Sequence, residues 1–111
     1  MESIGVDYFF ANDNEQRFFC MKIRDVKCSV HQFSNLFGEV GESLVRASFE
    51  NICIDLTKVP LVTSSTFGVC INVVALAKEY KKKLKFRFNS DAMETAKLAA
   101  FDDLVEIEEG E

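Results

Sequence analysis

Residues 51–86, NICIDLTKVPLVTSSTFGVCINVVALAKEYKKKLKF, contain a strand–helix–strand pattern that decides the fold class. The segment NICIDL (51–56) is a nearly continuous apolar run, which is typical of a central strand covered on both faces. LKFRF (84–88) alternates with period two, as a half-exposed strand does. Between them a helix is predicted from Thr66, because apolar residues recur at helical spacing: Phe67, Cys70, Val73, Val74, Ala77 and Tyr80. Such a unit predicts a right-handed crossover onto a sheet.

The flanking segments add a hairpin, two helices and a last strand. VDYFFA (6–11) and RFFCMKI (17–23) predict a β-hairpin whose loop, around the polar NDNE, has four or five residues. Ser29 and Gln32 match a capping box that opens a helix over about 30–47. Its predicted apolar face is Val30, Phe33, Leu36 or Phe37, Val40 and Leu44.

The C-terminal part is expected to hold a third helix, opened by Ser90 and Asp91, and a short strand LVEI (104–107). The apolar face of that helix is Met93, Ala96 and Ala100, and the final EEGE is expected to be a frayed end. The whole chain, 1–111, is therefore predicted to be one α/β domain with the order β-β-α-β-α-β-α-(β). Four to five strands would form a mixed central sheet with about three helices.

Composition excludes several classes of function. The chain has 111 residues, 48% of them hydrophobic, and a net charge of -5, which argues against binding nucleic acid. No apolar run approaches the length of about 18 residues that a membrane span needs, so membrane insertion is not expected. The start MESIGVDYFF lacks the basic segment of a signal peptide, and a cytoplasmic location is expected. Four cysteines without CxxC spacing are expected to be buried free thiols: Cys20, Cys28, Cys53 and Cys70.

No catalytic, metal or cofactor motif is present. His31 is the only histidine and has no partner at ligand spacing, so we interpret it as structural or exposed. One basic cluster could attract anionic partners, but we favour a solvated helix end and strand face: Lys78, Lys81, Lys82, Lys83, Lys85 and Arg87. The acidic C-terminal residues have no obvious partner: Asp102, Asp103, Glu106, Glu108 and Glu109. We expect a protein that is not an enzyme and that binds no metal and no cofactor.

The remaining candidate functional site is the hydroxyl-rich stretch VTSSTFG (62–68), which leads from a predicted strand into a predicted helix. Ser64 or Ser65 could cap the helix by accepting a hydrogen bond from its first turn. Capping needs only one hydroxyl, whereas four occur here in succession. Because the first turn of a helix is also favourable for anions, a serine here could carry a phosphate.

The same region resembles the core of the STAS domain, the family of bacterial anti-sigma factor antagonists. Asp55 and Leu56 match the end of the family's strand, and Leu61 and Val62 match the apolar pair that follows. Within the family's DSSGLG-like motif, the matching residues are Ser64, Ser65 and Gly68, and Phe67 replaces the leucine. Thr63 and Thr66 stand where the family has aspartate and glycine. The segment AAFDDLVEI (99–107) is similar to the family's closing segment.

This resemblance implies a switch protein regulated by phosphorylation of Ser64, with Ser65 as the second candidate. The expected partners are an anti-sigma factor that is also a serine kinase, and a phosphatase. Partner contacts are expected at Lys58, Thr63, Ser64, Ser65 and Thr66. The alternative is a STAS scaffold without phosphorylation, or a regulatory subunit of a stress-signalling assembly or a transporter; Thr63 and Thr66 favour that alternative.

Overall fold

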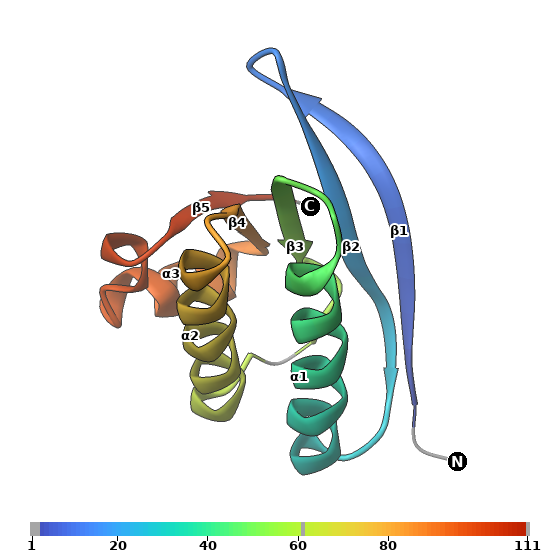
Figure 1. Cartoon of the computed structure of the whole chain (residues 1–111). Coiled ribbons are helices and arrows are strands. Elements are labelled where there is room, and N and C mark those ends of the chain that lie inside the picture. Colours follow the sequence, from blue (N-terminus) through green and yellow to red (C-terminus); the bar gives the residue numbers. More distant parts are fainter. Residues whose placement is uncertain (1–2, 61, 111) are drawn as a thin grey trace.

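The computed structural model describes residues 3–60 and 62–110 as an α/β fold (Figure 1). Five strands form one mixed sheet, and three α-helices pack with it in the order β-β-α-β-α-β-α-β, which confirms the predicted architecture. The elements are β1 (Ser3–Asp13), β2 (Gln16–Lys27), α1 (Val30–Arg46), β3 (Asn51–Asp55), α2 (Ser64–Glu79), β4 (Lys83–Phe88), α3 (Ser90–Leu98) and β5 (Glu106–Glu109). Among the described residues, no helix has the length and apolar character needed to cross a membrane.

The strands lie in the sheet in the same order as in the chain, β1-β2-β3-β4-β5. β1 and β2 pair antiparallel, whereas the pairs β2–β3, β3–β4 and β4–β5 are parallel. A helix joins each parallel pair, as such crossovers require. The strand–helix–strand interpretation of residues 51–86 is therefore confirmed.

The β1–β2 hairpin is longer and tighter than predicted. Asp13 pairs with Gln16, so only Asn14 and Glu15 form the turn, in place of a loop of four or five residues. Both turn residues have positive φ, 50° and 67°, which is the conformation of a type I′ turn. Such a turn matches the twist of the two strands, and this explains why pairing continues through residues that look like a polar loop.

One face of the sheet carries the main core. Ile52, Ile54 and Phe86 are 0% exposed and pack with buried residues of all three helices. In α1 the buried residues include Phe33, Phe37 and Leu44, whereas Val30, predicted on the apolar face, is exposed. Phe18, Cys20 and Cys53 form a second buried cluster. Because their positions alternate with Ile52 and Ile54 of β3 and Met21 of β2, this cluster lies on the opposite face of the sheet.

The C-terminal elements differ in detail from the prediction. Helix α3 begins at Ser90, as predicted, and Asn89 is its N-cap, because the Asn89 side chain accepts the hydrogen bond from Ala92 N. Ala100 is exposed and adopts φ 57°, which ends the helix, so it is not on the helix face. A short 3-10 turn (Phe101–Asp103) follows, and the last strand begins at Glu106 instead of residue 104. Pairing with β4 incorporates Glu108 and Glu109 into the sheet, although EEGE was expected to fray.

Candidate functional site

Two threonines cap helix α2. Thr63 is the N-cap residue, and its hydroxyl accepts a hydrogen bond from Thr66 N at 3.3 Å. In return, the Thr66 hydroxyl accepts from Thr63 N at 3.4 Å, which completes a reciprocal capping box. The prediction that Ser64 or Ser65 caps the helix, and that the helix starts at Thr66, is therefore wrong. With four hydroxyls in succession, side-chain chemistry alone did not distinguish the capping residue from its neighbours.

Ser64 and Ser65 occupy the first turn of α2, and both are exposed. The capping bonds use the threonine hydroxyls, so the serine hydroxyls are not needed for them. The first turn contains no acidic residue, and the backbone N–H groups at this end favour negative charge. This is a surface where a serine can be reached by another protein.

Only some residues of the predicted partner-contact surface are exposed. Lys58, Ser64 and Ser65 are exposed and Thr63 is half-buried. Thr66 is 1% exposed and cannot contact a partner, because its side chain points into the cap and the core. Leu61, from the apolar pair of the family resemblance, lies outside the described residues.

The first part of the segment before the serines is held by hydrogen bonds between its residues and the side chains of Asp55 and Asn89. Asp55 is 2% exposed, and one carboxylate oxygen accepts from the backbone N–H and the hydroxyl of Thr57, at 2.9 and 2.6 Å. The Asn89 side chain donates to the carbonyls of Thr57 and Val59, at 3.4 and 3.5 Å. Lys58 is thus displayed on a loop whose neighbours are fixed, which favours a preformed surface.

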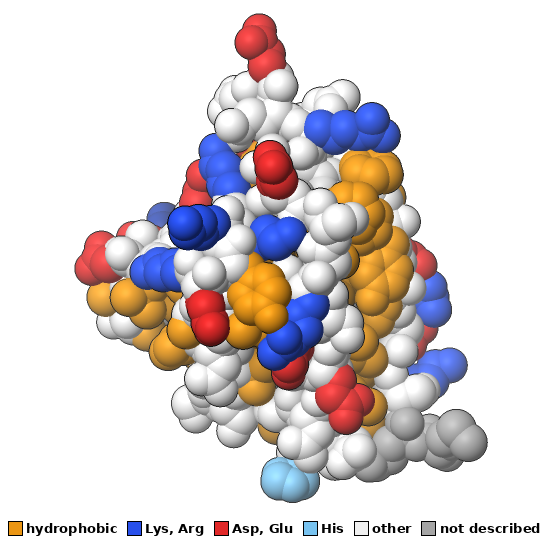
Figure 2. Space-filling view, viewed as in Figure 1, with side chains coloured by type: hydrophobic (Ala, Val, Ile, Leu, Met, Phe, Trp, Pro, Cys, Tyr) orange, Lys and Arg blue, Asp and Glu red, His pale blue; other side chains and the backbone are white. Residues whose placement is uncertain are grey.

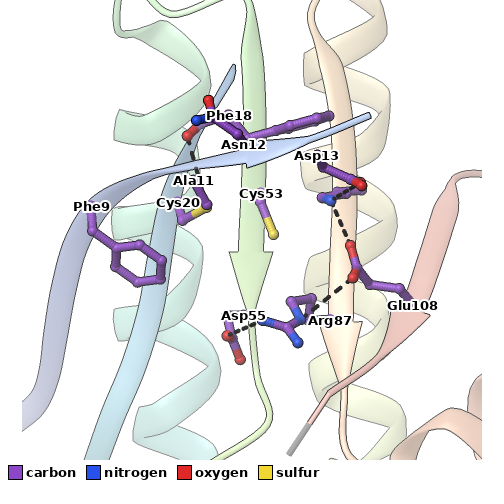
Figure 3. Close-up of a pocket in the computed structure, with 11 residues that line it drawn as sticks. Phe9, Ala11, Asn12, Asp13, Phe18, Cys20, Cys53, Asp55, Arg87 and Glu108 are labelled. Atoms are coloured by element: carbon purple, nitrogen blue, oxygen red, sulfur yellow. Dashed lines mark hydrogen bonds and ion pairs between the residues drawn. The ribbon is translucent and has the colours of Figure 1, made fainter. Parts of the chain in front are cut away.

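A separate group of charged residues lies on the face of the sheet that carries Cys20 and Cys53 (Figure 3). The Lys85 ammonium lies 2.6 Å from Asp13 and 2.6 Å from Glu108. It also lies 4.4 Å from the centre of the Phe18 ring. Lys85 is 5% exposed, so the prediction of a solvated strand face is wrong at this position. The Glu108 carboxylate has a partner that the sequence did not reveal.

Arg87 extends this group toward the end of β3. Its guanidinium lies 3.8 Å from Asp55 and 3.6 Å from Glu108. These five side chains, with Phe9, Phe18 and the two thiols, line a cavity of about 170 Å³. Three carboxylates and two cations leave a net charge of -1 there if all five are ionised. Ser64 and Ser65 do not line this cavity, so it is distinct from the start of α2.

The hydrogen bonds of this group shift several pKa values. Burial acts to lower the pKa of Lys85, but the hydrogen bonds to Asp13 and Glu108 outweigh it and the net pKa is raised. The hydrogen bond from Lys85 lowers the pKa of Asp13. A hydrogen bond with Cys53 lowers the pKa of Cys20 and raises that of Cys53. The contact between Lys85 and Asp13 therefore favours the charged form of both side chains.

One feature of the sequence indicates this group of charged residues. In β4, Lys85 and Arg87 alternate with buried phenylalanines, and in the pairing register they lie opposite Glu106 and Glu108. Alternating charges on two neighbouring parallel strands are a signal for cross-strand ion pairs. The contribution of Asp13 has no such signal, because it comes from the distant hairpin.

The described residues, 3–60 and 62–110, contain no group of three or more His, Cys, Asp or Glu side chains placed to hold a metal ion. Cys20, Cys53 and Cys70 are buried and Cys28 is half-buried, and none of the four is in a disulfide. His31 is exposed. No protein-family model matches the chain, and no curated protein matches it.

Proposed function

We propose that the protein is a non-enzymatic switch of the STAS type, which binds a protein partner in bacterial signalling and is controlled by phosphorylation of Ser64. The observation that carries this proposal is which residues cap the start of α2 and which are exposed there. Thr63 and Thr66 form the cap, whereas Ser64 and Ser65 are exposed. A serine that has no part in the cap can be modified without loss of the helix start.

The two departures from the family motif, which by sequence favour the scaffold, are also compatible with the switch. Thr63 stands where the family has aspartate, and both residue types are good N-caps. Thr66 stands where the family has glycine, and its buried hydroxyl returns the second hydrogen bond of the capping box. Thr63 and Thr66 thus act together in one capping box.

Phosphate chemistry supports Ser64 as the switch. A phosphoserine carries about -1.5 to -2 charges at pH 7. At the start of a helix this charge faces backbone N–H groups, so the free protein tolerates it. In a protein interface, the same charge must be desolvated or paired, so it opposes binding. Phosphorylation would therefore change affinity while the fold is kept.

The contact surface of the proposed partner comprises Lys58, Thr63, Ser64 and Ser65. By resemblance, the partner of the unmodified form is an anti-sigma factor with serine kinase activity, and a phosphatase restores that form. The switch would work in the cytoplasm, without nucleic acid, membrane insertion or a cofactor. The alternative, a scaffold or regulatory subunit without phosphorylation, is the outcome to separate experimentally.

Mass spectrometry of protein isolated from its native cells provides the first test. A phosphate on Ser64, absent from the Ser64→Ala variant, is expected for the switch. If every copy is unmodified under all growth conditions, the constitutive scaffold is the better function.

Calorimetry with the cognate partner provides the second test. Ser64→Asp should weaken binding by about 1–3 kcal/mol, because a charge is buried in the interface without full compensation. Ser64→Ala should bind like the wild type and resist the kinase. Lys97→Ala, an exposed position in α3, is the control and should not change affinity. Wild-type affinity of Ser64→Asp combined with loss in Lys97→Ala would place the interface elsewhere.

A further inference from the structure

Strand β1 exposes three consecutive aromatic residues at the edge of the sheet. Tyr8, Phe9 and Phe10 are 51%, 39% and 47% exposed. In the part of the chain that the structure describes, β1 has a neighbouring strand on one side only, because it is first in the sheet order. Figure 2 shows a ridge of hydrophobic side chains along the side of the molecule where Figure 1 places β1 and β2. An edge strand with this character offers unpaired N–H and C=O groups beside an apolar surface.

Lysine and proline, two residue types that normally block edge pairing, are missing from β1. Ser3–Asp13 contains no Lys, Arg or Pro. Its two acids are paired with cations of other strands, Asp7 with Arg24 and Asp13 with Lys85. The one irregularity is a register shift between Gly5 and Val6, which leaves Val6–Asp13 as a regular stretch.

The aromatic side chains of β1 are held in place by neighbours in the same molecule. Tyr8 stacks on Phe19, with ring centres 5.7 Å apart, and Phe10 lies 5.1 Å from the same ring. Phe49 also stacks on Phe19, with ring centres 3.9 Å apart. Arg17 lies 4.0 Å from the centre of the Phe10 ring. A preorganised aromatic surface loses little entropy when it is covered.

We propose that β1 pairs with β1 of a second copy, antiparallel and about a two-fold axis, to form a homodimer with a continuous ten-stranded sheet. Pairing with a second copy is favoured because β1 supplies the aromatic residues on both sides of the contact. In a two-fold dimer, the same surface patch of each copy forms the interface. Side chains on one face of an antiparallel pair lie opposite each other. Aromatic side chains of β1 in one copy can therefore lie opposite aromatic side chains of β1 in the other.

Repulsion between like charges distinguishes two possible registers of the β1–β1 pair. A pair centred on Phe10 would place Asp7 opposite Asp13 of the second copy, and like charges at opposite positions are unfavourable. A pair centred on Phe9 places Tyr8 opposite Phe10 and Asp7 opposite Ala11. The second register brings rings together and keeps the acids apart, so it is the one we assign.

The available area suits a dimer of moderate stability. With roughly 200 Å² of surface per aromatic residue, the exposed parts of the three residues amount to about 270 Å² per copy. Two copies then supply about half of the roughly 1,000 Å² that marks a specific interface. The proposal requires the backbone and flanking side chains of Val6–Asp13 to supply the remainder.

Sedimentation velocity over a range of protein concentrations tests the proposal. The wild-type chain is expected to be a dimer at micromolar concentration. Phe10→Lys and Tyr8→Lys should each raise the dimer dissociation constant at least about tenfold, because two charged side chains enter the aromatic contact per dimer. Leu98→Lys, at a position that is 83% exposed in α3, is the matched control and should remain dimeric.

Hydrogen exchange of the wild-type protein tests the same surface without a variant. The amides of Val6–Asn12 should exchange more slowly as the protein concentration rises, while those of α3 should not change. Circular dichroism checks that the variants are folded; if Phe10→Lys is not, Tyr8→Lys and the exchange data decide. A wild-type monomer at all concentrations, or a dimer unaffected by both β1 variants, would overturn the proposal.

Discussion

The Lys85 ammonium lies 2.6 Å from the carboxylate of Asp13, although 72 residues separate them in the chain. Lys85 is in β4 and Asp13 ends β1, so β2 and β3 lie between their strands in the sheet. The hairpin tip must therefore cross the face of the sheet opposite the helices, as Figure 3 shows. In this way the hairpin helps to bury Cys53, which is 1% exposed although the three helices of the described residues pack on the other face.

Replacing Lys85 should destabilise the protein. Lys85→Met removes the partner of two carboxylates, and we expect the free energy of unfolding to fall by about 1–3 kcal/mol. The loss is limited because Asp13 and Glu108 are 40% and 36% exposed and keep some contact with water. Lys83→Met, at an exposed position of the same strand, should change stability by less than about 0.5 kcal/mol. Equal denaturation midpoints in urea for the two variants would contradict the assigned role of Lys85.

The pairing of Asp13 predicts a dependence of stability on acid pH. The pKa of Asp13 is lowered from 3.8 by the hydrogen bond from Lys85, so the folded state binds a proton less readily than the unfolded state. Its contribution is therefore full at neutral pH and is lost as pH falls below the normal range of aspartate. The stability difference between wild type and Asp13→Asn should shrink between neutral pH and pH of about 3.

Urea denaturation across this range measures that difference. Asp102→Asn, an exposed carboxylate in the 3-10 turn, corrects for the general effect of removing one negative charge. A difference that stays constant down to the acid end would show that the ion pair with Lys85 does not stabilise the fold.

The capping box predicts which hydroxyl of the cluster matters for stability. Thr63→Ala should cost about 0.5–2 kcal/mol, because the N–H of Thr66 loses its acceptor. Ser64→Ala and Ser65→Ala should be close to neutral, because neither hydroxyl is used in the cap. Thermal denaturation of the three variants distinguishes them, and a larger loss in Ser64→Ala would show that the cap is assigned to the wrong residue.

Two glycines of α1 should respond in opposite ways to alanine. A Cβ at Gly38 would lie 3.7 Å from Val69, an ordinary contact, whereas at Gly41 it would lie 3.0 Å from Val73. Gly38→Ala should therefore stabilise the protein by up to about 1 kcal/mol through helix propensity. In Gly41→Ala the crowding against α2 should cancel or reverse that gain. Equal stabilisation in chemical denaturation would mean that the two helices pack less closely than described.

An acidic residue at position 64 should not harm the folded protein. Ser64→Asp places a negative charge in the first turn of α2 and should raise stability by about 0.3–1 kcal/mol at low ionic strength. The gain should decrease in high salt, because the charge is exposed and screened. Destabilisation in the melting curve would argue that a phosphate on Ser64 disrupts the fold instead of only an interface.

The local sequence predicted much of the architecture for a physical reason. Periods of 2 and 3.6 residues reflect which side of a strand or helix is buried, so β3, α2 and β4 were predicted in the right order. The same holds for Ser29, whose hydroxyl accepts from Gln32 N as the local pattern indicated. These features depend on residues only a few positions apart.

Other features were decided only by tertiary structure. Lys85 reads as an exposed strand residue, and its burial depends on Asp13 and Glu108, which reach it from two other strands. At the start of α2, four neighbouring hydroxyls are chemically alike, and the path of the chain selects Thr63 and Thr66 for the cap. Local periodicity thus determined which segments form helices and strands. The burial of charges and the exposure of Ser64 and Ser65 depend on how distant segments pack, and no single segment of the chain contains that information.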